Sequence, residues 1–107
     1  MLNKTFKKLE KVADEELEMA NKNNPPLFNS PHEGYAVILE EVEEAEADLI
    51  YSKLKLKNAW GEIKMDDNPK HCIEELCNYA LYGASELIQV AAMCKKFTYS
   101  AKNWEEE

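Results

Sequence analysis

The spacing of apolar positions along the chain predicts three helices, and the middle one carries the strongest signal. Its apolar residues recur at steps of three and four, the period of one helix face. These positions are Tyr35, Ile38, Leu39, Val42, Ala45, Leu49, Leu56, Trp60 and Ile63. Ser30 can cap this helix, Glu33 completes a capping box, and Pro31 suits the first helical position. The helix is therefore predicted to begin at Ser30.

A first helix is predicted over about residues 2–22, from an apolar stripe with lysines and glutamates on its other side. The stripe consists of Leu2, Phe6, Leu9, Val12, Ala13, Leu17 and Ala20. The pattern breaks over residues 21–29, where Pro25 and Pro26 cannot continue a helix. Phe28 in this loop either docks on the core or stacks on the base of a ligand.

A third helix is predicted over about residues 69–99, beginning at Pro69 after the capping residue Asn68. It is apolar on two sides, so we expect it to be buried between its own partners and another subunit. One face carries Ile73, Leu76, Cys77, Ala80, Ala84, Leu87, Ile88 and Ala91, and the other carries Tyr79, Tyr82, Val90, Met93 and Phe97. The tail from Trp104 to Glu107 is expected to be frayed and solvated.

These helices predict an all-α fold, with residues 1–107 forming a single domain. If the second helix runs unbroken from Ser30 to Lys64, its length is about 50 Å at the usual rise. That exceeds the width of a compact domain of this size. Either the helix kinks near Gly61, or its far half packs on another subunit. We therefore expect a helical bundle that is completed by oligomerisation.

The net charge and the composition of the chain indicate which kinds of binding partner are unfavourable. The formal charge of −8 disfavours nucleic acid and anionic membranes as partners. No apolar run approaches the roughly 20 residues of a membrane span, and residues 1–8 do not resemble a signal peptide, so we expect a cytoplasmic protein. Cys72, Cys77 and Cys94 lack the paired spacing of metal sites, and we interpret them as small apolar residues on a helix.

The acidic residues of the second helix are the first candidate for chemistry. Glu41, Glu44 and Asp48 lie three and seven positions apart and share one flank, with Glu40 and Glu43 close by. Like charges at this spacing repel one another, and no lysine lies among them. Either this flank is a solvated acidic face, or it binds a cation.

A second acidic position interrupts the apolar side of the third helix. Glu86 and Gln89 lie three residues apart among Tyr, Val and Met side chains, where a carboxylate is costly unless it is paired or binds a metal. Mg²⁺ prefers oxygen ligands, and carboxylates on two packed helices can form a box for the ion that bridges nucleotide phosphates. Glu41, Glu44 and Glu86 are candidates for such a box.

The two acidic elements resemble the motifs of a known family. Glu40-Glu41-Val-Glu-Glu44 matches the EExxE motif of the MazG-like all-alpha nucleotide pyrophosphohydrolases. Glu86-Leu-Ile-Gln89 stands where the ExxD element of that family follows. The surrounding sequence is similar to small MazG-like proteins of phages and prophages. The resemblance covers the motif-bearing helices, about residues 30–99, and the N-terminal helix and loop, residues 1–29, only loosely.

The resemblance implies an enzyme, a nucleoside triphosphate pyrophosphatase that converts an NTP or dNTP to the monophosphate and pyrophosphate. The cofactor would be Mg²⁺, or Mn²⁺, and the assembly a homodimer or homotetramer. By position, Glu40 and Glu41 would be catalytic, and the metal ligands would be Glu41, Glu44, Glu86 and Gln89. Substrate contacts are expected at His32, Phe28 and Lys95.

Two departures from the family pattern qualify this assignment. Gln89 replaces the Asp of the family, which removes one negative ligand, although an amide oxygen can still coordinate a metal. The interval between the two elements is also longer than is usual, and Asp48 or Glu75 could supply a missing carboxylate. The alternative function is therefore a catalytically inactive MazG-like phage protein that acts as a nucleotide-binding or helical interaction module.

Overall fold

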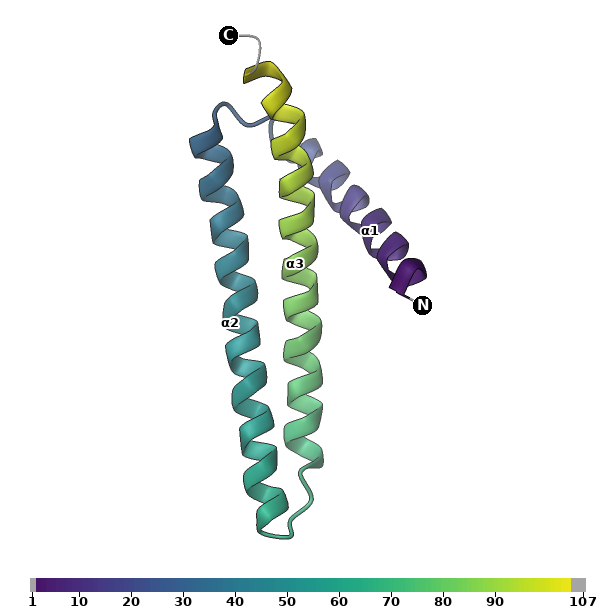
Figure 1. The fold of residues 1–107 in the computed structure, drawn as a ribbon, viewed down its shortest axis with the longest axis vertical. Helices are drawn as coiled ribbons and strands as arrows, with labels where there is room; N and C mark the ends of the chain where they lie inside the picture. The colour runs from purple at the N-terminus through teal and green to yellow at the C-terminus, as the bar shows by residue number, and fades with distance from the viewer. Residues whose placement is uncertain (1, 105–107) are drawn as a thin grey trace. The chain divides into compact units, whose positions relative to one another are not determined.

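The computed structural model describes residues 2–104 and shows an all-helical chain, as predicted (Figure 1). Helix α1 spans Leu2–Asn23, α2 spans Pro31–Lys64 and α3 spans Lys70–Trp104. Helix α2 continues through Gly61 without ending there, and α3 extends five residues beyond the predicted end at residue 99. Among residues 2–104, no helix could cross a membrane.

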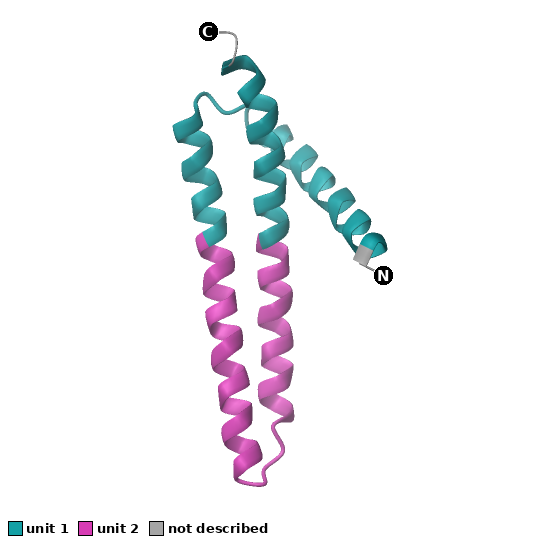
Figure 2. Cartoon of the chain, viewed as in Figure 1, with its two compact units in different colours: residues 1–42, 87–107 teal, residues 43–86 magenta. Residues whose placement is uncertain are grey.

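The chain divides into two compact units, which are coloured separately in Figure 2. Unit 1 contains α1, the connection to α2, the start of α2 as far as residue 42, and α3 from residue 87. Unit 2 contains residues 43–86, which are the rest of α2, the turn, and the start of α3. Both long helices therefore contribute to both units.

The ends of the helices are fixed by local hydrogen bonds, most of which the sequence predicts. The Glu33 backbone N–H donates to Ser30 Oγ at 3.2 Å, and the Lys70 N–H donates to Asn68 Oδ1 at 3.0 Å, so both predicted caps are confirmed. After α2, Asp66 takes a left-handed conformation (φ 59°), and the Asp67 N–H donates back to the Glu62 carbonyl at 2.9 Å. This is the hydrogen-bond pattern of a Schellman C-cap.

The core of unit 1 forms around the α1–α2 connection. Phe28, Ala92 and Met93 are buried there, and six further side chains pack against them: Leu17, Ala20, Val37, Ile38, Phe97 and Trp104. The Phe28 backbone N–H donates to the buried Ser100 Oγ at 2.8 Å, which ties the loop to α3. Phe28 therefore docks on the core, the first of the two alternatives.

Trp104 corrects one expectation from the sequence. Its ring meets Phe97 edge to face, with centroids 5.2 Å apart, so Trp104 belongs to the packed end of α3 and not to a solvated tail. Residues 105–107 of the expected tail lie outside the described residues. Trp104 lies two helical turns beyond Phe97 and one turn beyond Ser100, so its place on the same face would have indicated this continuation.

Gly34 is tightly packed in unit 1, and together with Gly61 it gives a matched pair of stability predictions. A Cβ atom at Gly34 would lie 2.5 Å from Phe97 Cδ2, whereas one at Gly61 would meet nothing within 4 Å. We expect Gly34→Ala to lower stability by about 1–2 kcal/mol, since overpacking outweighs its gain in helix propensity. Gly61→Ala should raise stability by up to about 1 kcal/mol. Urea unfolding of both variants measures the two signs, and equal effects would contradict the packing at Gly34.

Unit 2 is an antiparallel pair of helix segments (magenta in Figure 2). On each segment, buried and half-buried residues recur at steps of three and four and form a contact row that faces the other segment. The buried and half-buried row of α2 consists of Ala45, Asp48, Ser52, Lys55, Ala59 and Glu62. The row of α3 consists of Cys72, Leu76, Tyr79, Gly83 and Glu86. The helices approach closely at Gly83, where an added Cβ would lie 3.3 Å from Asp48 Cβ. Small and polar residues therefore dominate this contact.

Most residues of the apolar stripe predicted for the second helix are exposed, and another face of α2 packs within the chain. In unit 2, Tyr51 stacks on Tyr79 of the α3 row, whereas nine other large apolar side chains outside the contact rows are each between 44% and 61% exposed. They are Leu49, Ile50, Leu54, Leu56, Trp60, Ile63, Ile73, Leu81 and Tyr82. We call these nine residues the outer apolar face. Of the predicted stripe, Ala45 is buried and Ile38 half-buried.

Candidate metal centre

The centre of the candidate site is a pair of carboxylates in unit 2, Glu44 on α2 and Glu86 on α3. A side-chain hydrogen bond with Glu86 is the main cause that raises the pKa of Glu44 above its ordinary value of 4.5. The negative charge of Glu86, partial desolvation and the charge of Asp48 raise this pKa further. The two glutamates therefore lie close enough to share a proton, and in their ionised forms they repel each other.

Glu41 joins this pair, as the first sequence motif predicts. It precedes Glu44 by one turn of α2, and one carboxylate oxygen from each of Glu41, Glu44 and Glu86 lies within 4.8 Å of the others. We call these three residues the acidic group. Glu41 and Glu86 are half-buried, whereas Glu44 is exposed. The group is thus open to solvent on the side of Glu44.

The donor set of the acidic group fits a hard divalent cation. Mg²⁺ binds oxygen ligands at about 2.1 Å, so two oxygens on one ion lie about 3–4 Å apart, depending on their angle. Oxygens within 4.8 Å of one another need only small side-chain movements to reach that separation. Mg²⁺ usually keeps several waters, so a site for it needs only a few carboxylate ligands. Mn²⁺ accepts the same ligands.

The other acidic residues considered from the sequence, Glu40, Glu75 and Asp48, lie outside the acidic group. Glu40 is exposed and is not part of the acidic group. Glu75 lies 3.3 Å from the Lys55 ammonium and 3.3 Å from His71 Nε2, so its carboxylate is already engaged in unit 2. Asp48 is half-buried and acts on the acidic group through its charge on Glu44.

Gln89 lies in unit 1 and is engaged by a residue that the sequence did not indicate. Its Nε2 donates to Glu16 Oε2 of α1 at 2.8 Å. Glu16 lies 73 residues away in the sequence and on the charged side of α1, so no local pattern could have paired the two. This hydrogen bond links α1 to the last residue of the second acidic sequence element on α3.

The three residues expected to contact substrate all lie in unit 1, in different environments. Phe28 is 4% exposed and part of the core, and His32 is exposed in the first turn of α2. Lys95 Nζ donates to Asp14 Oδ1 at 2.6 Å, and this hydrogen bond raises the pKa of Lys95. Sequence reasoning missed the neighbouring Lys96, which is only 7% exposed.

The cysteines differ from one another in exposure. Cys72 is buried, and its thiol donates to Glu62 Oε2 at 3.4 Å. Burial raises the pKa of Cys72, and the hydrogen bond with Glu62 raises it further. Cys77 and Cys94 are exposed, and all three cysteines are free. Cys72 thus packs as a small apolar residue would, and its thiol stays protonated at neutral pH.

Compared with protein-family models, with curated proteins and with solved structures, the chain shows no significant match to any of them. The interpretation of the acidic group therefore depends on its own residues and geometry.

Proposed function

We propose that the chain is a MazG-like, Mg²⁺-dependent nucleoside triphosphate pyrophosphohydrolase that works as an oligomer. The observation that supports this proposal best is the acidic group, in which the EExxE residues Glu41 and Glu44 lie within 4.8 Å of Glu86 from the second element. Carboxylates of two helices lie near one another here, and Glu86 raises the pKa of Glu44. A divalent cation would remove the repulsion between them.

The proposed roles of the residues follow from their positions. Glu41 and Glu44 from α2 and Glu86 from α3 would hold the cation, which would neutralise charge on the phosphates and lower the pKa of an attacking water. Glu40, which is exposed and precedes Glu41 in the sequence, would take the proton of that water. Gln89 would contribute its amide oxygen, since its Nε2 is occupied by Glu16.

The proposed activity is tested by the products it makes. The purified protein is incubated with the eight common NTPs and dNTPs while Mg²⁺ is titrated, and monophosphate and pyrophosphate are measured separately. We expect equal amounts of monophosphate and pyrophosphate, and no product when EDTA removes the metal. Release of orthophosphate with a diphosphate product would indicate a different reaction, and no turnover of any nucleotide would contradict the proposal.

The outer apolar face supports the oligomeric part of the proposal. Nine large apolar side chains of unit 2 are each 44% exposed or more, and contact with another subunit would remove them from water. The polar contact row of unit 2 adds little hydrophobic stabilisation within the chain, so another subunit on the outer face would supply what is missing. We therefore propose a homodimer or homotetramer that is closed through this face.

We expect Leu56→Glu to dissociate the oligomer. A carboxylate at this 56% exposed position costs little in the single chain, but it would have to be desolvated in an apolar interface. Sedimentation at about micromolar concentration should show an oligomer for the unmodified protein and a monomer for Leu56→Glu. Asn3→Glu makes the same change in charge at an exposed position of α1 in unit 1, outside the outer apolar face, and should leave the assembly intact. A stable monomer without any substitution would contradict the oligomer.

The second candidate function is an inactive MazG-like interaction module, which the environment of Gln89 favours. A glutamine that is held by Glu16 in place of a metal-binding aspartate is consistent with a site that has lost its chemistry. In that case the outer apolar face would be the functional surface. An oligomer that binds no Mg²⁺ and releases no pyrophosphate would identify this second function.

A further inference from the structure

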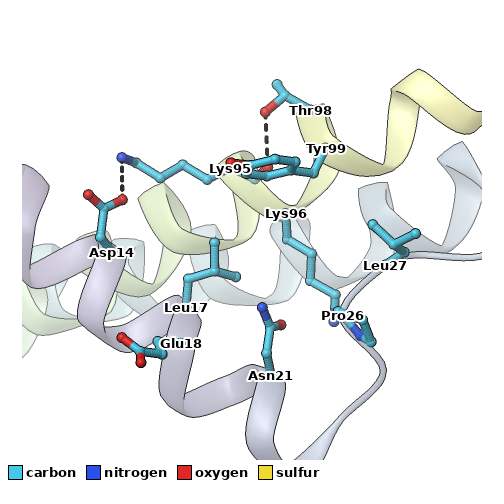
Figure 3. Close-up of a pocket in the computed structure, with 10 residues that line it drawn as sticks. All are labelled: Asp14, Leu17, Glu18, Asn21, Pro26, Leu27, Lys95, Lys96, Thr98 and Tyr99. Atoms are coloured by element: carbon cyan, nitrogen blue, oxygen red, sulfur yellow. Dashed lines mark hydrogen bonds and ion pairs between the residues drawn. The ribbon is translucent and has the colours of Figure 1, made fainter.

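Unit 1 contains a cavity of about 540 Å³, which lies within the size range of small-molecule sites (Figure 3). Residues of α1, the α1–α2 connection and the end of α3 line it. Leu17 and Leu27 supply apolar walls, and Tyr99 presents a ring that is 60% exposed. The cavity therefore combines apolar surface, an accessible aromatic ring and polar groups.

Lys96 is the charged group of this cavity that lacks an anionic partner. The residue is only 7% exposed, and its ammonium lies 4.6 Å from the centroid of the Phe28 ring. No carboxylate among residues 2–104 lies within ion-pair distance of it. A buried ammonium is costly unless an anion compensates it, and a phenyl ring compensates only in part.

The neighbouring Asn21 has an unmet hydrogen-bonding group in the same cavity. Its Oδ1 is shielded from water and accepts no hydrogen bond from any described residue. Figure 3 shows Lys96 extending from α3 toward the connection, beside Asn21, while the Glu18 carboxylate points away from both. Lys95 is paired with Asp14 on the other side of the cavity. The lining of the cavity therefore carries two lysines and two carboxylates, and Lys96 is its buried charge without an ion-pair partner.

We propose that this cavity binds a small planar organic anion. The anionic group would meet the Lys96 ammonium, the planar part would lie against the Tyr99 ring and Leu17, and the amide of Asn21 would hydrogen-bond a polar edge. Both phosphates and carboxylates carry such an anionic group, and a nucleoside monophosphate has a suitable size. None of these residues belongs to the acidic group, so the inference does not depend on that group or on the proposed hydrolysis.

Calorimetric titration in EDTA tests the site without contribution from a metal. The probes are the nucleoside monophosphates, the corresponding nucleosides, inorganic phosphate, and benzoate as an aromatic carboxylate. We expect a ring that carries an anionic group to bind better than either part alone. Preference for the monophosphates identifies a phosphate ligand, and preference for benzoate identifies a carboxylate ligand. Failure of every probe at millimolar concentration would overturn the proposal.

Variants of the cavity separate binding from folding. Lys96→Met keeps the length of the side chain and should weaken binding about tenfold or more, whereas Lys22→Met removes an exposed charge of α1 and should not. Tyr99→Ala changes an exposed residue and should weaken binding without unfolding unit 1. Asn21→Ala should raise the melting temperature of the free protein and weaken binding. Unchanged affinity in both Lys96→Met and Tyr99→Ala would show that the probe binds elsewhere.

Discussion

Glu44→Gln is expected to raise the melting temperature of the metal-free protein and to remove its stabilisation by Mg²⁺. The carboxylate of Glu44 repels those of Glu86 and Asp48, as its raised pKa shows, and an amide relieves this repulsion. A cation that binds only the folded state raises its stability, so loss of a ligand removes that effect. If the protein hydrolyses nucleotides, the same substitution should slow the reaction by about a hundredfold. Thermal unfolding with and without millimolar Mg²⁺ measures the first two effects.

The pH dependence of the stability of the metal-free protein provides a second test of the repulsion at Glu44. The folded protein holds a proton on Glu44 more tightly than the unfolded chain, because the folded pKa lies above 4.5. The contribution of this group to stability is therefore complete below pH 4.5 and is lost as the pH rises through the folded pKa. Glu44→Gln should flatten this part of the curve of melting temperature against pH, and Mg²⁺ should recover stability on its alkaline side.

Glu46→Gln is the matched control, because Glu46 is an exposed residue of α2 in unit 2 that is not part of the acidic group. It removes the same charge and should leave both the response to Mg²⁺ and the pH curve unchanged. If Mg²⁺ and Mn²⁺ at millimolar concentration stabilise neither the unmodified protein nor the control, the acidic group is an ordinary acidic surface. Equal effects of the two substitutions would mean that net charge alone decides stability.

The secondary structure could be predicted because capping residues and prolines, which act locally, determine where the helices begin and end. Ser30 and Asn68 cap the helices whose starts they predict, and the prolines before α2 cannot continue α1. The sequence pattern predicts too early an end for α3, because Ser100 is a polar residue of a type that is usually exposed. In the structure Ser100 is fully buried, since its hydroxyl accepts from the Phe28 N–H and donates to the Lys96 carbonyl.

The packing partner of each helix face could not be predicted in the same way. Apolar periodicity identifies which face of a helix avoids water, but not whether that face meets its own chain or another one. In unit 2 the helices pair through Asp48, Ser52 and Lys55, while Leu56 and Trp60 remain exposed. Hydrogen bonds, ion pairs and close approach at small residues determine this contact, and none of these has a recognisable period in a single sequence.

The candidate site was predictable to the extent that it is local. Glu41 and Glu44 lie one turn apart on α2, and the motif led to Glu86 as their partner on α3. The engagement of Gln89 by Glu16 could not be foreseen, because it depends on where α1 packs. The unpaired Lys96 was missed for a similar reason, since lysines next to one another in a helix usually both face solvent.

Gln89→Asp is expected to destabilise the metal-free protein and to tighten its binding of Mg²⁺. The Gln89 amide donates to Glu16 at 2.8 Å, and a carboxylate in its place would face Glu16 as a like charge. Loss of a partly buried hydrogen bond to a charged group costs about 1.5 kcal/mol or more. In the proposed metal centre, however, the substitution restores the negative ligand of the family motif. Because metal affinity in oxygen sites rises with ligand charge, apo-protein affinity for Mg²⁺ should increase about tenfold.

The double variant Glu16→Gln/Gln89→Asp separates these two effects. It exchanges donor and acceptor between α1 and α3, so the hydrogen bond and the stability should return while the additional carboxylate remains. Unfolding in EDTA then reports the hydrogen bond, and Mg²⁺ titration reports the ligand. We expect the double variant to bind Mg²⁺ more tightly than the unmodified protein and to depend less on nucleotide for that binding, because the triphosphate no longer has to supply the missing anionic oxygen. If the double variant is stable but binds Mg²⁺ no more tightly, and Glu86→Gln also leaves binding unchanged, the second element holds no metal, and Gln89 serves to fix α1 against α3.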